Sequence, residues 1–80
     1  MAVTVVYLGP LRDLAGCASA EFASPLDWGG LLAGVPEAVA DQLRLERVKV
    51  ACAGRVLADK TSLSAQDGEE VALLPPVSGG

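Results

Sequence analysis

The sequence predicts an α+β domain in which a helix packs across one face of a mixed β-sheet. Residues 3–8 (VTVVYL) are almost all apolar and mostly β-branched, as is typical of a strand inside a sheet. An apolar stripe with helical spacing follows between Trp28 and Val35. Two more strand-like segments, residues 48–53 (VKVACA) and 69–74 (EEVALL), come after that stripe. Strands on both sides of one amphipathic helix are expected to share a single core.

Length and composition indicate one small globular domain. The chain has 80 residues, of which 51% are hydrophobic and 20% are charged. A domain of this length buries only roughly 60% of the surface of its unfolded chain, so its core is small. We expect residues 1–74 to form the domain and residues 75–80 to form an extended tail, because Pro75 and Pro76 end strand pairing.

The first half of the chain predicts two strands joined by a helical turn. Residues 3–8 should form a central strand that is buried on both faces. Gly9 and Pro10 end this strand, and residues 11–16 (LRDLAG) follow as a short helical turn. Residues 18–23 (ASAEFA) then form a second, weaker strand.

The helix start is predicted at Ser24. This serine can act as the N-cap, with Pro25 at the first helical position and the acidic Asp27 three residues after the cap. The stripe that faces the sheet comprises Trp28, Leu31, Leu32 and Val35. Trp28 is expected in the core, with ligand stacking as the alternative. Pro36 interrupts the helix before two further turns.

The second half predicts three more strands. Residues 48–53 form one strand, residues 55–57 return beside it, and residues 69–74 close the sheet. Asp67-Gly68 is expected to be a simple turn before the last strand, rather than a metal or phosphate site. This order of elements is that of a β-grasp fold. If the first and last strands are parallel neighbours at the sheet centre, the tail has a rigid base.

Charge and hydropathy exclude several classes of partner. The formal net charge is −4, and the six Lys and Arg residues are spaced singly, so no basic stripe can follow a nucleic-acid backbone. No apolar run reaches the roughly 18 residues of a membrane-spanning helix, and no secretory signal opens the chain. We expect a cytoplasmic protein that binds neither nucleic acid nor membranes. Its acidic surface favours a protein partner with a basic surface.

The two cysteines do not indicate a metal or catalytic site. Cys17 and Cys52 are far apart in the sequence, the chain contains no histidine, and no C-x-x-C spacing occurs. Cys52 is expected as a small buried apolar side chain, and Cys17 in an exposed loop. Without a histidine base, neither thiol has the usual partner of a catalytic nucleophile. We expect no metal, no cofactor bound by this chain and no catalysis by the chain alone.

The last eight residues (LLPPVSGG) carry the chemistry. Glycine has no Cβ, so Gly79 and Gly80 can pass through a narrow channel and bring a terminal carboxylate to a reaction centre. Six residues from Pro75 span at most roughly 20 Å, and the prolines reduce the freedom lost on insertion. A partner enzyme would have to activate the carboxylate, for example as an acyl-adenylate made from ATP. Attack by sulfur then gives a thiocarboxylate, and attack by a lysine gives an isopeptide; an inert tail is the remaining alternative.

These residues resemble a known family. The segment Asp67–Gly80 (DGEEVALLPPVSGG) and the element Arg12–Gly16 (RDLAG) are similar to those of the MoaD family, the small subunits of molybdopterin synthase. These are β-grasp, ubiquitin-like sulfur carriers. The double proline before Val-Ser-Gly-Gly is the most specific part of the likeness. Carriers of the thiamine pathway and ubiquitin-like protein modifiers usually share only the diglycine, and both remain alternatives.

The resemblance implies a role in molybdenum cofactor biosynthesis. Gly80, preceded by Gly79, is adenylated by a MoeB-like adenylyltransferase that uses ATP and is converted to a thiocarboxylate. The tail, including Pro75, Pro76, Val77 and Ser78, then enters the active site of a MoaE-like large subunit. Sulfur passes there to cyclic pyranopterin monophosphate and forms the molybdopterin dithiolene. The complex is a heterotetramer in which the chain is a sulfur-donating subunit, not an enzyme on its own.

The same resemblance implies an apolar contact beside the tail. The matching positions for contact with the large subunit are Leu8, Leu74 and Val56. Ordinary core packing is the alternative for each of these residues.

Overall fold

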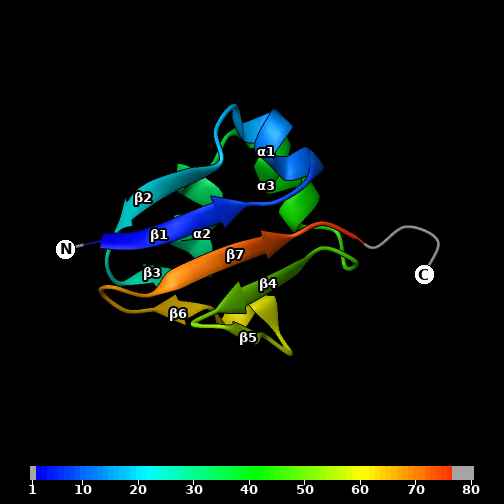
Figure 1. Ribbon diagram of the computed structural model, residues 1–80. Helices are drawn as coiled ribbons and strands as arrows, with labels where there is room; N and C mark the ends of the chain where they lie inside the picture. The colour runs from blue at the N-terminus through cyan, green and yellow to red at the C-terminus, as the bar shows by residue number, and fades with distance from the viewer. Residues whose placement is uncertain (1, 77–80) are drawn as a thin grey trace.

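The computed structural model describes residues 2–76 and contains a five-stranded mixed sheet with helices packed on one face (Figure 1). The strands of this sheet lie in the order β2 (Ser19–Ala23), β1 (Ala2–Tyr7), β7 (Glu70–Leu74), β4 (Lys49–Cys52) and β5 (Arg55–Val56). Two short strands, β3 (Leu26–Asp27) and β6 (Ser64–Ala65), pair separately. The predicted α+β class is therefore confirmed.

The first and last strands are parallel neighbours inside the sheet. β1 pairs with β7 in a register that places Val5 opposite Val71, and β7 pairs on its other side with the antiparallel β4. β7 is the middle strand of the five. The sequence predicts a rigid tail base if the first and last strands are parallel neighbours at the sheet centre. This arrangement is observed, and Leu74 ends a strand that is paired on both sides.

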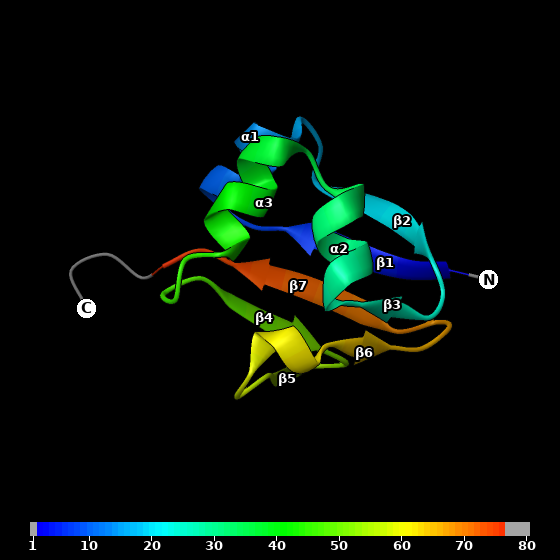
Figure 2. The ribbon, with the colours of Figure 1, turned by 180° about the vertical axis from the view of Figure 1, so that it is seen from behind.

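The core lies between the sheet and two helices, α2 (Trp28–Gly34) and α3 (Glu37–Leu43). These helices lie behind the sheet in Figure 1 and in front of it in Figure 2, so they cover the same face. A shorter helix, α1 (Pro10–Ala15), packs near α3, and a 3-10 turn, η1 (Lys60–Ser62), follows β5. The fully buried side chains of the core include Val3, Val5, Leu31, Val39, Leu43, Val48, Val50, Val71 and Leu73.

The predicted helix start, with Ser24 as the N-cap, is wrong by three residues. Leu26 is buried and pairs with Ala65 in the two-stranded sheet, so the chain stays extended through Asp27. The helix begins at Trp28, and Asp27 is its N-cap: the Asp27 Oδ1 accepts a hydrogen bond from the Gly30 N–H at 2.7 Å. Both residues can cap a helix, and strand pairing of Leu26 decides between them.

The prediction that the first strand is buried on both faces is also wrong. Val3, Val5 and Tyr7 are buried, whereas the alternate residues Thr4 and Val6 are only half-buried. Side chains alternate across a strand, so the half-buried set faces away from α2 and α3. We call this side of the five-stranded sheet the open face. Figure 1 looks onto it.

Two further expectations concern local segments. The Asp67-Gly68 turn is structural, as predicted: the Asp67 carboxylate accepts a hydrogen bond from the Ala2 N–H at 2.8 Å, and the Gly68 N–H donates to the Ala2 carbonyl at 2.9 Å. These bonds tie the turn to the start of β1. Within residues 2–76, none of the helices has the length and apolar character needed to cross a membrane.

Candidate functional site

The described part of the chain ends at the base of the predicted tail. Pro75 and Pro76 directly follow β7, and the predicted site residues Val77, Ser78, Gly79 and Gly80 lie outside the described residues.

Gly9 contacts the tail base from the end of β1. A Cβ atom built on Gly9 would lie 3.2 Å from Pro75 Cγ, and the Gly9 φ of +55° is unfavourable for residues with a side chain. This glycine therefore lets the loop after β1 pass close to Pro75.

An apolar row crosses the open face beside this base. Val6 on β1 lies opposite Ala72 on β7, Ala72 lies opposite Ala51 on β4, and Ala51 lies opposite Val56 on β5. Directly opposed residues point to the same face of a sheet, so these four side chains form one continuous row. We call Val6, Ala72, Ala51 and Val56 the apolar row. It spans four of the five strands.

The structure places the three predicted contact residues on or next to this row. Val56 ends the row and is 60% exposed. Leu74 is two residues beyond Ala72, hence on the same face, and is half-buried. Leu8 directly follows β1 and is 38% exposed. Burial in the core, the alternative for each residue, is therefore wrong for Leu8 and Val56.

Sequence reasoning missed Val6, Ala51 and Ala72. Ala72 lies two residues before Leu74 in a strand-like segment, and side chains two residues apart point to the same face of a strand. The sequence pattern could therefore have identified Ala72. Val6 and Ala51 join the row through the register of β1 and β4 against β7, which no local pattern shows.

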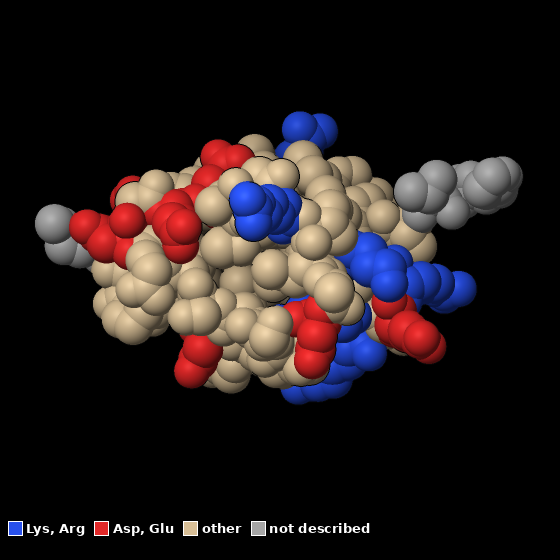
Figure 3. Space-filling model, turned by 90° about the horizontal axis from the view of Figure 1, so that it is seen from below, with Lys and Arg blue, Asp and Glu red and all other residues tan. Residues whose placement is uncertain are grey.

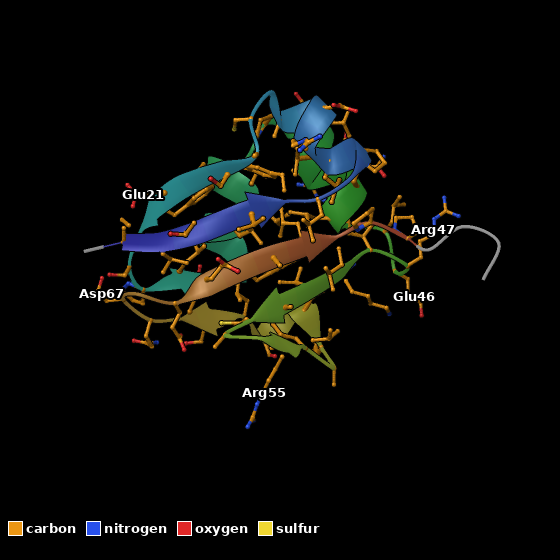
Figure 4. All side chains as sticks on the ribbon, in the orientation of Figure 1. Glu21, Glu46, Arg47, Arg55 and Asp67 are labelled. Carbon is orange, nitrogen blue, oxygen red and sulfur yellow. The ribbon has the colours of Figure 1, made fainter. Side chains whose placement is uncertain are left out.

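The open face also changes in charge from one end to the other. At one end, Thr4 lies between Glu21 on β2 and Glu70 on β7. At the other end, Leu74 lies opposite Lys49. Figure 4 shows Glu21 at the end of the sheet that is away from the tail base. The same view shows Arg47 beside the tail base. The apolar row therefore lies between an acidic end and a basic end.

Neither cysteine belongs to the apolar row or lines the tail base. Cys52 is half-buried rather than fully buried, and its Sγ lies 4.0 Å from a Glu69 carboxylate oxygen. Burial raises the pKa of the Cys52 thiol, and the Glu69 charge raises this pKa further, so less of the thiol is thiolate at neutral pH. Cys17 is exposed in the loop after α1, as predicted. Within the described residues, His, Cys, Asp and Glu side chains form no group that could hold a metal ion.

Trp28 lies at the edge of the core and contacts a lysine. The indole is half-buried, and the Lys60 ammonium lies 5.9 Å from its ring centroid, within cation–π range. Lys60 also donates hydrogen bonds to the carbonyls of Leu45 and Val48. The prediction of Trp28 as a core residue is therefore correct only for part of the side chain.

Solved structures share this fold over the whole chain. A Haloferax volcanii protein, HVO 2177, is 24% identical with a TM-score of 0.75, covering 100% of this chain and 87% of that one. Small archaeal modifier protein 1 from Methanosarcina acetivorans is 18% identical with a TM-score of 0.76, and the match covers 99% of this chain and 96% of that one. A complex of subunits 1 and 2 of molybdopterin-converting factor from Helicobacter pylori 26695 contains a chain with 25% identity and a TM-score of 0.66, covering 100% of both chains.

Sequence comparison defines the family. No curated protein sequence matches the chain significantly. The model of the ThiS family matches residues 5–80, which include the apolar row, the tail base and the diglycine. The predicted β-grasp fold is thereby confirmed. The chain belongs to the ThiS family and is a small ubiquitin-like β-grasp protein of the ThiS/MoaD sulfur-carrier type.

Proposed function

We propose that this chain is the small, sulfur-donating subunit of molybdopterin synthase, with residues 75–80 as its functional tail and Gly80 as its terminal residue. One observation carries the proposal. The middle strand of the sheet, β7, runs directly into Pro75 and Pro76, beside the apolar row. A partner that accepts the tail can therefore pack against this row and Leu74 at the same time.

The geometry of the base supports insertion of the tail into a partner. β7 is paired on both sides through Leu73, Leu74 pairs with Lys49 on β4, and Pro75 lies close to Gly9. The four residues beyond Pro76 can span at most roughly 14 Å when extended. Fixing the base reduces the conformational entropy lost when such a segment enters a channel, and glycine at the last two positions leaves room around the carboxylate.

The proposed chemistry takes place on the terminal carboxylate. A MoeB-like adenylyltransferase joins the Gly80 carboxylate to the α-phosphate of ATP, which releases pyrophosphate and leaves an acyl-adenylate. A sulfur nucleophile displaces AMP and leaves a thiocarboxylate. The thiocarboxylate sulfur then transfers to cyclic pyranopterin monophosphate in the active site of a MoaE-like subunit, and water restores the carboxylate. The chain supplies the carrier atom, and its partners supply ATP chemistry and catalysis.

The complex from Helicobacter pylori supports this choice of partner. It joins subunits 1 and 2 of molybdopterin-converting factor, and one of its chains matches the present chain over its full length. We propose that the apolar row, together with Leu8 and Leu74, contacts such a second subunit. Two copies of the chain would sit at opposite ends of a large-subunit dimer.

The test is reconstitution with purified components. The isolated chain should have the intact mass of a protein that ends at Gly80. After incubation with the adenylyltransferase, ATP and a sulfur source, one oxygen should be replaced by sulfur, and the product should form molybdopterin when the large subunit and precursor are added. A variant without Gly79 and Gly80 should show neither change. A wild-type chain that never gains sulfur would contradict the proposal.

A second candidate is a protein modifier that is joined to lysines. The likeness to small archaeal modifier protein 1 favours it, since that protein has the same fold over nearly the whole chain. Recovery of this chain in isopeptide linkage to other proteins in cell extracts would support a modifier. A thiamine-type carrier shares the thiocarboxylate but would not form molybdopterin with the large subunit, so the last step of the reconstitution separates these candidates.

A further inference from the structure

A groove borders the tail base on the side away from Gly9. Its lining residues come from the segment between α3 and β4, from β4 itself and from the tail base: Leu45, Glu46, Arg47, Lys49 and Pro75. The volume of the groove is about 640 Å³, which is enough for several side chains of another protein. Leu45 and Pro75 make part of its surface apolar. Because Pro75 belongs to both features, a partner that contacts the tail base also adjoins the groove.

The charge of the groove is opposite to that of the whole protein. Arg47 and Lys49 outnumber Glu46 in its lining, whereas the chain has a net charge of −4. Both cations are exposed, and the ion pair found among residues 2–76 joins Arg44 to Asp41, not to the groove. Lys60 adds a further positive charge nearby: Lys49 and Glu46 line a second hollow, of about 220 Å³, together with Lys60.

The pKa of Lys60 shows that these charges act on each other. Burial lowers this pKa from its ordinary value, and the positive charge of Lys49 lowers it further, while Glu46 opposes the shift. A pair of lysines that repel one another makes a site where an added carboxylate is stabilised.

A group of acidic residues, which includes Glu21, Asp67 and Glu70, lies at the opposite end of the molecule. In the view of Figure 3, a cluster of Asp and Glu atoms marks one end, and most of the Lys and Arg atoms lie on the half nearer the C-terminal end. Figure 4 labels Glu21 and Asp67 at the first end, and Arg47 together with Glu46 beside the end of β7. The molecule therefore has a charge asymmetry along the direction in which β7 points.

We propose that the groove of Leu45, Arg47, Lys49 and Pro75 is a docking site for an acidic segment of the adenylating partner, placed beside the entrance that receives the tail. Carboxylates of that segment pair with Arg47 and Lys49, and an apolar side chain packs against Leu45 and Pro75. The asymmetry orients the chain during encounter, with the tail base leading, which raises the association rate more than the final affinity. This inference rests on the proposed function, because it requires a partner that adenylates the tail.

The test compares two charge reversals with the same net charge. In the groove variant, Arg47→Glu and Lys49→Glu are combined. In the control variant, Arg12→Glu and Arg55→Glu change the net charge equally at exposed positions outside the groove. The association rate constant with the adenylyltransferase is measured by stopped flow at several salt concentrations. Thermal unfolding of both variants confirms that they remain folded.

The groove variant should associate at least about tenfold more slowly than wild type at low salt, and this difference should shrink as salt rises. The control variant should change by less than about threefold. Equal slowing of both variants would overturn the proposal, because net charge alone would then explain the rates. Sedimentation gives a second check. If the wild type forms a homo-oligomer and the groove variant is monomeric, the proposal is overturned, since a second copy of the chain would then occupy the groove.

The experiment distinguishes a failure of the proposed function from a failure of the groove proposal. At saturating adenylyltransferase, the groove variant should still form the acyl-adenylate at the wild-type maximal rate, because its tail is intact. If wild type is never adenylated, the proposed function is wrong. If wild type is adenylated but the groove variant associates normally, the groove inference is wrong and the function stands.

Discussion

Two glycines of α2 differ sharply in the space around them. A Cβ atom on Gly34 would lie 2.3 Å from Cε2 of Phe22, far inside van der Waals contact. On Gly29 the nearest atom would be Asp27 Oδ1 at 3.8 Å, which is an ordinary contact. Phe22 lies on β2 and packs against the core, so Gly34 allows the helix end to approach that strand.

We expect Gly34→Ala to lower the free energy of unfolding by about 1–3 kcal/mol, because the Phe22 ring must move. Gly29→Ala, the matched control, should raise the free energy of unfolding by about 0.5–1 kcal/mol, since alanine favours a helix more than glycine does. Urea unfolding measures both changes. Combining Phe22→Leu with Gly34→Ala should recover part of the loss, and additive effects of the two substitutions would contradict the contact.

At the scale of elements, Lys60 joins η1 to the segment that leads into β4. Its ammonium donates to the carbonyls of Leu45 and Val48 and lies near the ring of Trp28. The segment between α3 and β4 is thereby connected to Trp28 of α2 through one side chain. Leu45 also lines the groove, so this connection supports one wall of it.

Lys60→Met should lower the free energy of unfolding by about 1–3 kcal/mol, because two backbone carbonyls lose their hydrogen-bond donor. Lys49→Met, at an exposed lysine, should change it by less than about 0.5 kcal/mol. The folded state has the lower Lys60 pKa, so it loses the proton first as pH rises. The stability advantage of wild type over Lys60→Met should therefore increase as pH rises through that pKa towards the ordinary lysine value. Denaturant titrations at several alkaline pH values test the sign, and a decreasing advantage would contradict it.

At the scale of the whole molecule, the two faces of the sheet have different tasks. The face towards α2 and α3 holds the fully buried valines and leucines that stabilise the fold. The open face carries the apolar row, with Val56 exposed at its end. Val56 is exposed, Val6 and Ala72 are half-buried, and Ala51 is buried. Apolar side chains that remain partly uncovered beside the proposed tail are typical of a protein-binding surface. Substitutions on the open face should therefore affect binding more than stability.

Val56→Asp should weaken binding to the large subunit by about tenfold or more, because a charge would be buried against an apolar contact. Its free energy of unfolding should change by less than about 0.5 kcal/mol, since the site is exposed. Leu14→Asp is the matched control, because Leu14 is an exposed leucine on α1, outside the open face. Calorimetric titration gives the affinities. Equal losses for the two variants would show that the apolar row has no special part in binding.

Much of the fold follows from local patterns. The segments 48–53 and 69–74 contain the strands predicted for them, and β1 is shifted by one residue from the predicted segment 3–8. β-branched and alternating apolar residues favour strands wherever they pack. The helix start was wrong because Ser24 and Asp27 are both good caps. Pairing of Leu26 with Ala65, far along the chain, keeps Ser24 outside the helix. The expected burial of residues 3–8 on both faces failed because an apolar run does not reveal which face lacks a covering element.

The sequence by itself determined the element types, the β-grasp order and the carrier chemistry proposed for Gly80. These depend on residue identity and on neighbours a few positions away. Only the tertiary structure decided which side chains share the open face and that Arg47 and Lys49 border the tail base. The physical reason is the register of β7 against β1 and β4, which joins residues far apart in the sequence through backbone hydrogen bonds. A shift of one residue in that register would turn Ala72 and Leu74 to the opposite face.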